Sequence, residues 1–398
     1  MSRLPALHMR PKMAGRVAHG HPWAYSNEIA MTPEARSLTP GEVVRLLNAD
    51  GRHIATGVFN PNSLVAFRVL TREDGTAIDA GFFAERVKRA LALRERLYDT
   101  PFYRLVHGEA DGLPGLVVDR FGDVVSVQLN GAGMERLKED LLLGLARILA
   151  PKSVVLRRNA RERALEGLAA AEEEVEIRGQ SLDGPVALSE NGLRYRADLV
   201  AGQKTGWFFD HRDNRAFAAR LARGGDILDL YAYGGGFGLL AAQAGAHSVL
   251  MVDRSRQALA LAQGAARENG LIDRTAFEAA EVFDFLEQAA ASGRRYDLVL
   301  ADPPAFVTSK KALASGLKGY RKLARLAAAT VAPQGVLMLA SCSQPVSADA
   351  LLAEMRAGLA AAGRSSRVLR IAGAGADHPI HPHLPEAAYL KAIFVALD

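Results

Sequence analysis

The feature that most constrains the fold of this chain is a regular alternation of strand-like and helix-like segments from about residue 205 to the C-terminus. Short runs rich in Val, Ile and Leu are separated by Ala-rich or amphipathic segments long enough to form helices. Strands joined by helices pair mostly in parallel, with helices on both faces, so the pattern predicts a Rossmann-like, doubly wound α/β sheet. The expected strands are Ile227–Leu230, Ser248–Val252, Ala276–Ala279, Leu298–Ala301, Val336–Ala340, Val368–Ile371 and Leu390–Leu397.

The residues before this alternation have a different pattern, and a chain of 398 residues is too long for one ordinary core. The N-terminal part contains short β-prone runs separated by Asn, Asp, Gly and Pro, which indicates a small β-rich domain. Its expected strands are Val43–Leu47, His53–Phe59 and Leu64–Leu70. The middle part mixes strands with an amphipathic helix near Phe83–Leu97, which indicates an α+β domain. The expected domains are therefore 1–72, 73–188 and 189–398.

Composition excludes several protein classes. The chain is 49% hydrophobic and 23% charged, and it contains no apolar run long enough to span a bilayer. The first 20 residues lack the hydrophobic stretch of a secretory signal. A single cysteine, Cys342, excludes an internal disulfide framework and a cysteine-based zinc site. We therefore expect a cytoplasmic protein with no membrane partner and no metal.

The strongest local motif follows the first strand of the alternating region. Asp229 precedes a turn that contains Gly234 and Gly236 and opens into a helix. Such a turn lets backbone N–H groups approach a ligand. The next strand ends at Asp253, where a carboxylate can accept hydrogen bonds from both hydroxyls of a ribose. Together these features predict a site for a cofactor that contains adenosine.

The glycine spacing distinguishes between two such cofactors. The dinucleotide fingerprint requires Gly-x-Gly-x-x-Gly, whereas this turn has Gly234, Gly236 and Gly238, with Leu239 at the third fingerprint position. Asp229 beside the turn would repel a pyrophosphate, but it suits the cationic amino-acid end of S-adenosylmethionine. The residues therefore favour a methyl donor over a nicotinamide dinucleotide.

Two further motifs lie where the fourth and fifth strands end. Asp302 is followed by two prolines, which have no N–H to donate and hold the chain in a stiff turn. Cys342 follows the fifth strand, at the edge where such folds place their active sites. Carbon 5 of cytosine is a poor nucleophile until a thiolate adds at carbon 6, which gives this cysteine a chemical purpose. Asp302 could then hydrogen-bond to the ring nitrogen or protonate it.

A basic stretch without acidic residues follows the Asp-Pro-Pro motif, and it is a candidate surface for contacts with RNA phosphates. The candidate RNA-binding residues are Lys310, Lys311, Lys318, Arg321 and Lys322.

These motifs resemble those of the bacterial large-subunit (23S) rRNA cytosine-C5 methyltransferases, which carry an N-terminal PUA RNA-binding domain. The likeness extends over nearly the whole chain. The motifs that carry it are Gly20-His21-Pro22-Trp23, Gly108-Glu109-Ala110-Asp111-Gly112-Leu113-Pro114-Gly115, Gly202-Gln203-Lys204-Thr205-Gly206, Asp210-His211-Arg212-Asp213-Asn214-Arg215, Asp377-His378-Pro379 and Tyr389-Leu390-Lys391.

The resemblance implies a class I methyltransferase domain with S-adenosyl-L-methionine as cofactor, and a partner that is 23S rRNA or a large-subunit assembly intermediate. It implies Cys342 as the nucleophile with Asp302 as its catalytic partner. Glu281 stands where the family usually has Asp, and Ala305 stands where two-cysteine enzymes have a second Cys, so the base that removes the carbon-5 proton is left open. The implied cofactor-binding residues are Lys204, Asp229, Tyr231, Gly234, Gly236, Phe237, Asp253, Arg254, Glu281 and Asp302.

Other functions are compatible with the same motifs. An enzyme that methylates a base nitrogen would use Asp302 and Phe306 to orient the base, and Cys342 would be incidental. A non-catalytic RNA-binding assembly factor could retain the fold as a scaffold. A nicotinamide dehydrogenase is disfavoured by the glycine spacing. The sequence leaves the modified nucleotide and the oligomeric state open, a homodimer included.

Overall fold

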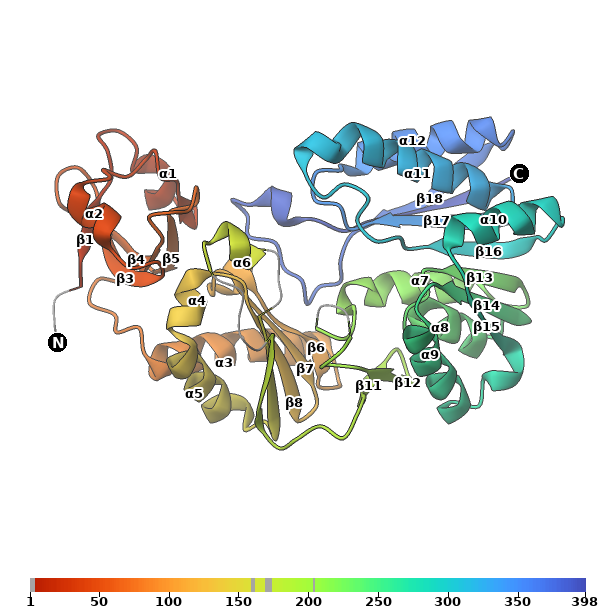
Figure 1. Ribbon diagram of the computed structural model, residues 1–398, viewed down its shortest axis with the longest axis horizontal. Helices are drawn as coiled ribbons and strands as arrows, with labels where there is room; N and C mark the ends of the chain where they lie inside the picture. Colours follow the sequence, from red (N-terminus) through yellow and green to blue (C-terminus); the bar gives the residue numbers. More distant parts are fainter. Residues whose placement is uncertain (1–3, 159–161, 169–173, 203–204) are drawn as a thin grey trace. The chain divides into compact units, whose positions relative to one another are not determined.

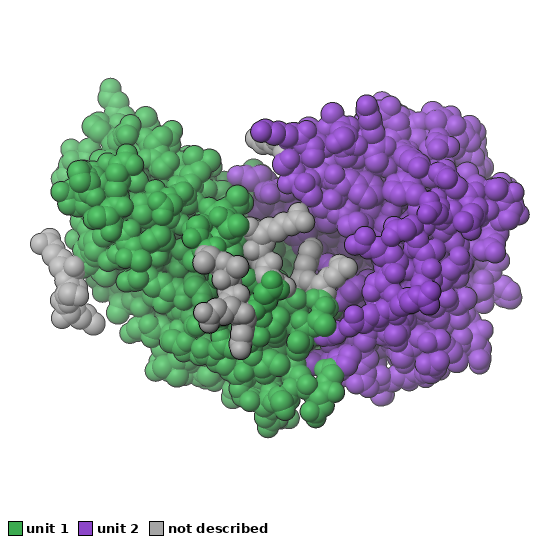
Figure 2. All heavy atoms as spheres, in the orientation of Figure 1, with its two compact units in different colours: residues 1–184, 199–206, 376–385 green, residues 185–198, 207–375, 386–398 purple. Residues whose placement is uncertain are grey.

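The computed structural model describes residues 4–158, 162–168, 174–202 and 205–398. The chain forms two compact units, coloured separately in Figure 2. Unit 1 comprises residues 1–184, 199–206 and 376–385, and unit 2 comprises residues 185–198, 207–375 and 386–398. Two short segments from the C-terminal half of the chain thus belong to unit 1. The domain boundaries expected at residues 72 and 188 stay predictions.

Unit 2 is built on a seven-stranded sheet with strand order β15-β14-β13-β16-β17-β19-β18. The first five strands of this order pair in parallel, whereas β19 is antiparallel to both of its neighbours. The predicted doubly wound sheet is confirmed. The strands are β13 (Asp226–Leu230), β14 (Ser248–Asp253), β15 (Thr275–Ala279), β16 (Tyr296–Ala301), β17 (Val331–Ser341), β18 (Ser366–Ala372) and β19 (Lys391–Leu397), and a separate hairpin is formed by β11 (Val186–Glu190) and β12 (Leu193–Ala197).

Helices cover both faces of this sheet: α7, α8 and α9 lie on one face, and α10, α11 and α12 lie on the other (Figure 1). The core between the sheet and the second helix layer is almost wholly aliphatic and aromatic, as the hydrophobic runs in the sequence require. The helices are α7 (Arg212–Leu221), α8 (Gly236–Gln243), α9 (Arg256–Glu268), α10 (Val282–Ala291), α11 (Leu313–Ala328) and α12 (Ala348–Ala361).

Unit 1 contains two five-stranded sheets, each with its own hydrophobic core. The N-terminal sheet has the order β1-β3-β4-β5-β2 and the second has the order β10-β9-β8-β7-β6. The strands are β1 (Ala6–His8), β2 (Trp23–Ala24), β3 (Glu42–Leu47), β4 (His53–Phe59), β5 (Phe67–Thr71), β6 (Phe102–His107), β7 (Leu116–Phe121), β8 (Val124–Leu129), β9 (Ser153–Arg157) and β10 (Val175–Gly179). The helices are α1 (Gly15–Ala18), α2 (Pro33–Ser37), α3 (Ala80–Leu97), α4 (Ala132–Arg136), α5 (Lys138–Leu149) and α6 (Glu162–Leu165).

Two predicted boundaries in unit 1 are wrong for local reasons. The strand expected from Leu64 begins only at Phe67, because Asn60 organises a turn: its side-chain oxygen accepts from the N–H of Asn62 and its carbonyl accepts from the N–H of Ser63. The helix expected from Phe83 begins at Ala80, since the carboxylate of Asp79 caps it by accepting from two backbone N–H groups.

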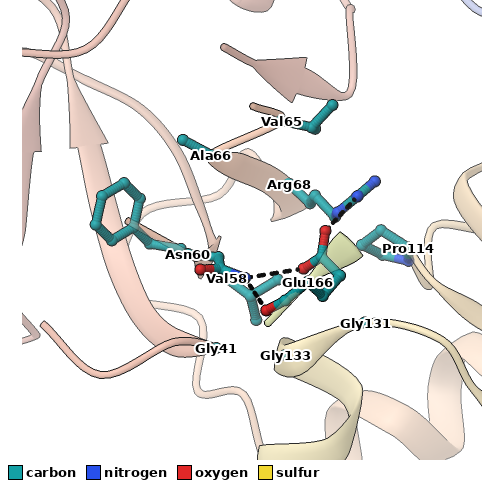
Figure 3. Close-up of a pocket in the computed structure, with 11 residues that line it drawn as sticks. Gly41, Val58, Asn60, Val65, Ala66, Arg68, Pro114, Gly131, Gly133 and Glu166 are labelled. Atoms are coloured by element: carbon teal, nitrogen blue, oxygen red, sulfur yellow. Dashed lines mark hydrogen bonds and ion pairs between the residues drawn. The ribbon is translucent and has the colours of Figure 1, made fainter. Parts of the chain in front are cut away.

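A small pocket lies in unit 1 between the N-terminal sheet and the turn after α6 (Figure 3). The carboxylate of Glu166 lies in it, and its side chain is 8% exposed. It accepts hydrogen bonds from the side chains of Asn60 at 3.2 Å, Ser63 at 3.2 Å and Arg68 at 2.9 Å. The pocket contains none of the candidate site residues, and these bonds tie α6 to the N-terminal sheet.

Among the described residues, no helix is both long enough and apolar enough to cross a bilayer. Within the same part of the chain, no cluster of three His, Cys, Asp or Glu side chains is arranged to hold a metal ion.

Candidate active site

The turn after β13 is held in an unusual backbone conformation. Tyr231 has φ 60° and Tyr233 has φ 48°, in the left-handed region that non-glycine residues rarely adopt. Gly235, with φ 78°, completes the turn before α8 begins. Left-handed backbone at two tyrosines costs conformational energy, and such strain is concentrated at functional sites.

Asp229 lies beneath this turn. Its side chain is buried, and its Oδ2 accepts a hydrogen bond of 2.8 Å from the backbone N–H of Gly238 in the first turn of α8. Burial raises the pKa of Asp229 to about 7, although the bond from Gly238 favours the charged form. Asp229 is thus a carboxylate whose charge state changes near neutral pH.

The glycines of the turn have a packing role in addition to the expected approach to a ligand. A Cβ atom on Gly236 would lie 2.5 Å from Nε of Arg215, and one on Gly234 would lie 3.2 Å from the ring of Trp207. Arg215 and Trp207 both bond to the buried carboxylate of Glu190, at 2.7 Å and 3.2 Å. This buried group supports the turn from below, and the sequence motifs did not indicate it.

Asp253 ends β14 at the same edge of the sheet, where the prediction placed it. Its Oδ2 accepts from the N–H of Tyr233 at 3.0 Å, and its Oδ1 accepts from the N–H of Ser255 at 2.8 Å. Burial raises the pKa of the Tyr231 hydroxyl, and the negative charges of Glu281 and Asp253 raise it further. Tyr231 therefore lies within electrostatic reach of both carboxylates.

The remaining predicted cofactor residues differ in how far they are exposed to solvent. Phe237 is buried, with its ring 5.3 Å from that of His211 and 5.6 Å from the guanidinium of Arg215. Arg254 is exposed. Lys204 lies outside the described residues.

Asp302 follows β16 and contacts a histidine that the sequence motifs gave no separate role. Nε2 of the buried His211 lies 3.2 Å from Oδ1 of Asp302. The side-chain amide of Asn214 donates to the carbonyl of Gly373 at 3.1 Å, which fixes its NH₂ group, and the same nitrogen lies 3.2 Å from Nδ1 of His211. Nδ1 is therefore an acceptor, and the neutral ring carries its proton on Nε2, facing Asp302.

The charge of His211 is set by opposing influences. Burial is the largest single influence and lowers the pKa of the imidazole, but the carboxylates of Asp302 and Asp210 together outweigh it and raise the pKa above its usual value. The bond from Asn214 favours the neutral ring. In both charge states His211 presents an N–H to Asp302, which keeps this carboxylate an oriented acceptor.

Cys342 directly follows β17 and is partly exposed. The flanking serines are buried and fixed by Tyr320: Oγ of Ser341 donates to the tyrosine hydroxyl at 2.8 Å, and Oγ of Ser343 lies 2.9 Å from it. Because β16 and β17 are adjacent and parallel, with Ala301 opposite Leu339, Asp302 and Cys342 follow neighbouring strands at the same edge. The structure therefore brings the two predicted catalytic residues to one edge of the sheet.

Phe306, the aromatic residue of the nitrogen-methylation alternative, packs on side chains of the protein itself. Its ring centroid lies 4.8 Å from that of Tyr320 and 6.2 Å from that of Phe283. It belongs to the partly buried rim of the hydrophobic core.

The predicted basic rim lies on α11 and the turn before it. Lys311 and Lys318 are exposed. Arg321 forms an ion pair of 2.7 Å with Glu354, and Lys322 forms one of 3.2 Å with Glu287. The side chain of Lys310, the fifth candidate, lies outside the described part of the chain. Two of the five predicted RNA contacts thus already have acidic partners within the protein.

The sequence of the chain matches two protein families and is similar over nearly its whole length to several bacterial proteins. A family described as S-adenosylmethionine-dependent methyltransferase matches residues 168–396, and a PUA-like domain family matches residues 7–72. Ribosomal RNA large subunit methyltransferase I of Shewanella denitrificans is 34% identical over 389 residues, which cover 97% of each chain. The protein of the same name from Tolumonas auensis is 35% identical over 94% of this chain and 95% of its own. The chain belongs to the family of S-adenosylmethionine-dependent methyltransferases.

Solved structures agree on the fold of this methyltransferase. The structure of a SAM-dependent methyltransferase from Streptococcus mutans superposes with a TM-score of 0.82 at 18% identity, and it covers 99% of this chain and 100% of its own. A second methyltransferase structure, a complex with SAH, superposes with a TM-score of 0.83 at the same identity and coverage.

The residues at the edge of the sheet fit S-adenosylmethionine, the cofactor of the family. The donor carries a cationic sulfonium and an amino group together with a ribose diol. Asp229 and Asp253 are carboxylates at the ends of adjacent strands, and both are oriented by backbone N–H groups of the turn region. Acceptors of this kind suit both the positive charge and the hydroxyl groups of the donor.

Proposed function

We propose that this methyltransferase acts on large-subunit ribosomal RNA and forms 5-methylcytosine through a covalent bond between Cys342 and the base. The relatives named ribosomal RNA large subunit methyltransferase I, which match nearly the whole chain, support the RNA class. The observation that carries the carbon-5 chemistry is the position of the only cysteine, directly after β17 and beside the strand that Asp302 follows.

For the methyl donor we propose two principal contacts. Asp253 holds the ribose hydroxyls, and Asp229 faces the cationic amino-acid end. Bound S-adenosylmethionine supplies the methyl group that is transferred to carbon 5. The further residues proposed to surround the donor are Lys204, Tyr231, Gly234, Gly236, Phe237, Arg254, Glu281 and Asp302.

The protein's own groups would act on the base in sequence. Sγ of Cys342, as the thiolate, forms a bond to carbon 6, and the electron pair of the 5,6 double bond moves toward ring nitrogen 3 and makes carbon 5 nucleophilic. Asp302, whose Oδ1 accepts from the N–H of His211, donates a proton from its other oxygen to the ring nitrogen where this charge develops, and takes the proton back when the 5,6 double bond re-forms. After methylation a base removes the proton of carbon 5, the double bond re-forms, and the bond between Sγ and carbon 6 breaks to return the thiolate.

Covalent trapping tests this function. RNA that carries 5-fluorocytosine at the target should stall after methyl transfer, because fluorine cannot leave carbon 5 as a proton does. A protein–RNA band that survives denaturing electrophoresis is expected with the wild type and not with Cys342→Ala, and no second thiol can replace the missing one. Cys342→Ala should still bind S-adenosylmethionine, which serves as the folding control. Near wild-type methylation by Cys342→Ala would establish the base-nitrogen alternative, with Asp302 and Phe306 orienting the base.

We further propose that the PUA-like domain supplies RNA affinity and that the exposed lysines of α11 and of the turn before it contact phosphates. The matched PUA-like family and the absence of donor residues from this part of the chain support the first assignment. The expected cytoplasmic location stays a prediction, and the oligomeric state stays open.

A further inference from the structure

A buried lysine lies beside the proposed nucleophile. Lys391 is the first residue of β19 and pairs in register with Ser341, the residue before Cys342. It is 6% exposed. Its Nζ donates to the carbonyl of Ser343 at 2.7 Å and to the carbonyl of Tyr389 at 2.7 Å. The ammonium group is therefore tied to the backbone of the residue that follows the cysteine and to the backbone of Tyr389.

The partners of Lys391 do not neutralise its charge. Both identified acceptors are carbonyl oxygens, and no carboxylate of the described residues forms an ion pair with it. Burial lowers the pKa of Lys391 to about 8, and the opposing influence, which favours the charged ammonium, comes from Cys342. A buried cation without a nearby anion is costly. A methionine or leucine would fill this position at lower cost if packing were its only purpose.

Tyr320, a second titratable group beside the cysteine, cannot supply a positive charge. Tyr320 is buried, and burial raises the pKa of its hydroxyl above the usual value, so the phenol is neutral at physiological pH. Its hydroxyl is engaged with Ser341 and Ser343. Tyr320 on α11 and Lys391 on β19 both interact electrostatically with Cys342, and of this pair Lys391 is the cation.

We propose that Lys391 is a positioning residue that holds Cys342 as the thiolate. The inference rests on the proposed role of Cys342 as nucleophile, although the thiolate itself is detectable without RNA. The proton of the thiol passes to solvent while Lys391 remains an ammonium. The ammonium group of Lys391 favours the thiolate at two steps of the reaction. The first is the attack of Sγ on carbon 6, and the second is the departure of Sγ from carbon 6 at the end.

Because Cys342 is the only cysteine, the alkylation rate of the intact protein by iodoacetamide reports on this thiol alone. The rate follows the thiolate fraction, so its dependence on pH gives the thiol pKa. For the wild type we expect an inflection below the ordinary value of about 8.5. For Lys391→Met we expect the inflection to rise by about one unit or more, with about tenfold slower alkylation near pH 7. Lys391→Arg, which keeps the charge, should stay closer to the wild type.

The controls separate this role from a structural one and from the proposed function. Arg220→Met removes an exposed cation from α7 of the same unit and should leave the inflection unchanged. S-adenosylmethionine binding by each variant confirms its folding. If Lys391→Met does not fold, the wild type and Lys391→Arg decide the question, because a wild-type inflection at or above about 8.5 overturns the proposal. An unchanged inflection in folded Lys391→Met also overturns it. A thiolate present without trapping by 5-fluorocytosine would refute the proposed function and leave this inference standing.

Discussion

Asp229 illustrates how a single buried carboxyl group can couple cofactor binding to pH. Its pKa is raised to about 7 by burial, so the folded protein retains a proton on it between about pH 4 and pH 7 that the unfolded chain has lost. The contribution of Asp229 to folding stability therefore falls as the pH rises through this window. Ionisation of Asp229 should, in contrast, strengthen the binding of a cation.

The prediction concerns the affinity for S-adenosylmethionine. We expect the affinity to rise several-fold, and by at most about tenfold, between pH 6 and pH 7.5, because the cationic donor favours the ionised carboxylate. Calorimetric titrations at the two pH values measure it. Asp229→Asn should bind more weakly and lose most of the rise. A rise that persists in Asp229→Asn would assign it to another group.

His211 is predicted to act through Asp302. Replacing it by leucine removes the N–H that orients the carboxylate, and misplacement of a catalytic group by about 1 Å can cost about a hundredfold in rate. We expect His211→Leu to lower kcat by about that factor. The KM for S-adenosylmethionine should change little.

Glutamine provides the matched variant, because its amide can place an N–H near the position of Nε2. His211→Gln should recover most of the rate and lose any dependence on the ionisation of the imidazole. Single-turnover methylation as a function of pH measures both effects. If leucine and glutamine reduce kcat equally, His211 supports the fold and does not orient Asp302.

The residues predictable from sequence are those at strand ends. Asp229, Asp253 and Asp302 each follow or end a hydrophobic run, so the expected sheet alone brought them to one edge. The motifs of the family resemblance contained His211 and Lys391, but they gave neither residue a role of its own. Their roles depend on contacts to Asp302 and Ser343, which lie 91 and 48 residues away in the sequence. No local pattern specifies such tertiary pairs.

At the scale of elements, the charge of a helix is a poor guide to what the helix can bind. The sequence shows six basic residues between Lys310 and Arg325, five of them proposed to contact RNA, without an acidic residue among them. Their acidic partners come from other helices, since Glu354 lies on α12 and Glu287 lies on α10. The periodicity that locates a helix does not tell which side chains of neighbouring helices reach it.

The two exposed lysines, Lys311 in the turn before α11 and Lys318 on α11, therefore make the sharper prediction for RNA binding. Lys311→Ala with Lys318→Ala should flatten the slope of log K against log salt by about 0.7–0.9 for each phosphate that the variant no longer neutralises. Arg321→Ala is the matched control, because Glu354 already neutralises this guanidinium, and it should change the slope less. Filter binding or fluorescence anisotropy over a range of salt concentrations measures the slopes. Equal slopes in the wild type and the double variant would assign the lysines to an ordinary solvated surface.

At the scale of the whole molecule, the expected sheet with its strand positions was predictable because hydrophobic runs and turn residues are local signals. In contrast, the sequence did not predict that residues 199–206 and 376–385 belong to unit 1, because in both places the chain leaves unit 2 and then returns to it. The returning segment is fixed by Asp377, whose carboxylate accepts from the N–H of Arg104 at 3.0 Å and whose carbonyl accepts from Arg94 at 2.9 Å. The two compact units are therefore not continuous stretches of the sequence.

We expect a loss of folding stability in unit 1 to leave the affinity for S-adenosylmethionine unchanged. A substitution of Glu166 tests this expectation. Glu166→Gln removes one of the two carboxylates that pair with Arg68, while Glu109 remains as the other, so the change should cost about 1–2 kcal/mol of stability in unit 1. The described residues that we propose to hold the donor all lie in unit 2, so the affinity for S-adenosylmethionine should be unchanged while RNA binding weakens. Urea denaturation and calorimetry on the same sample measure the two quantities. A parallel loss of donor affinity would mean that unit 1 and the cofactor site are energetically one structure.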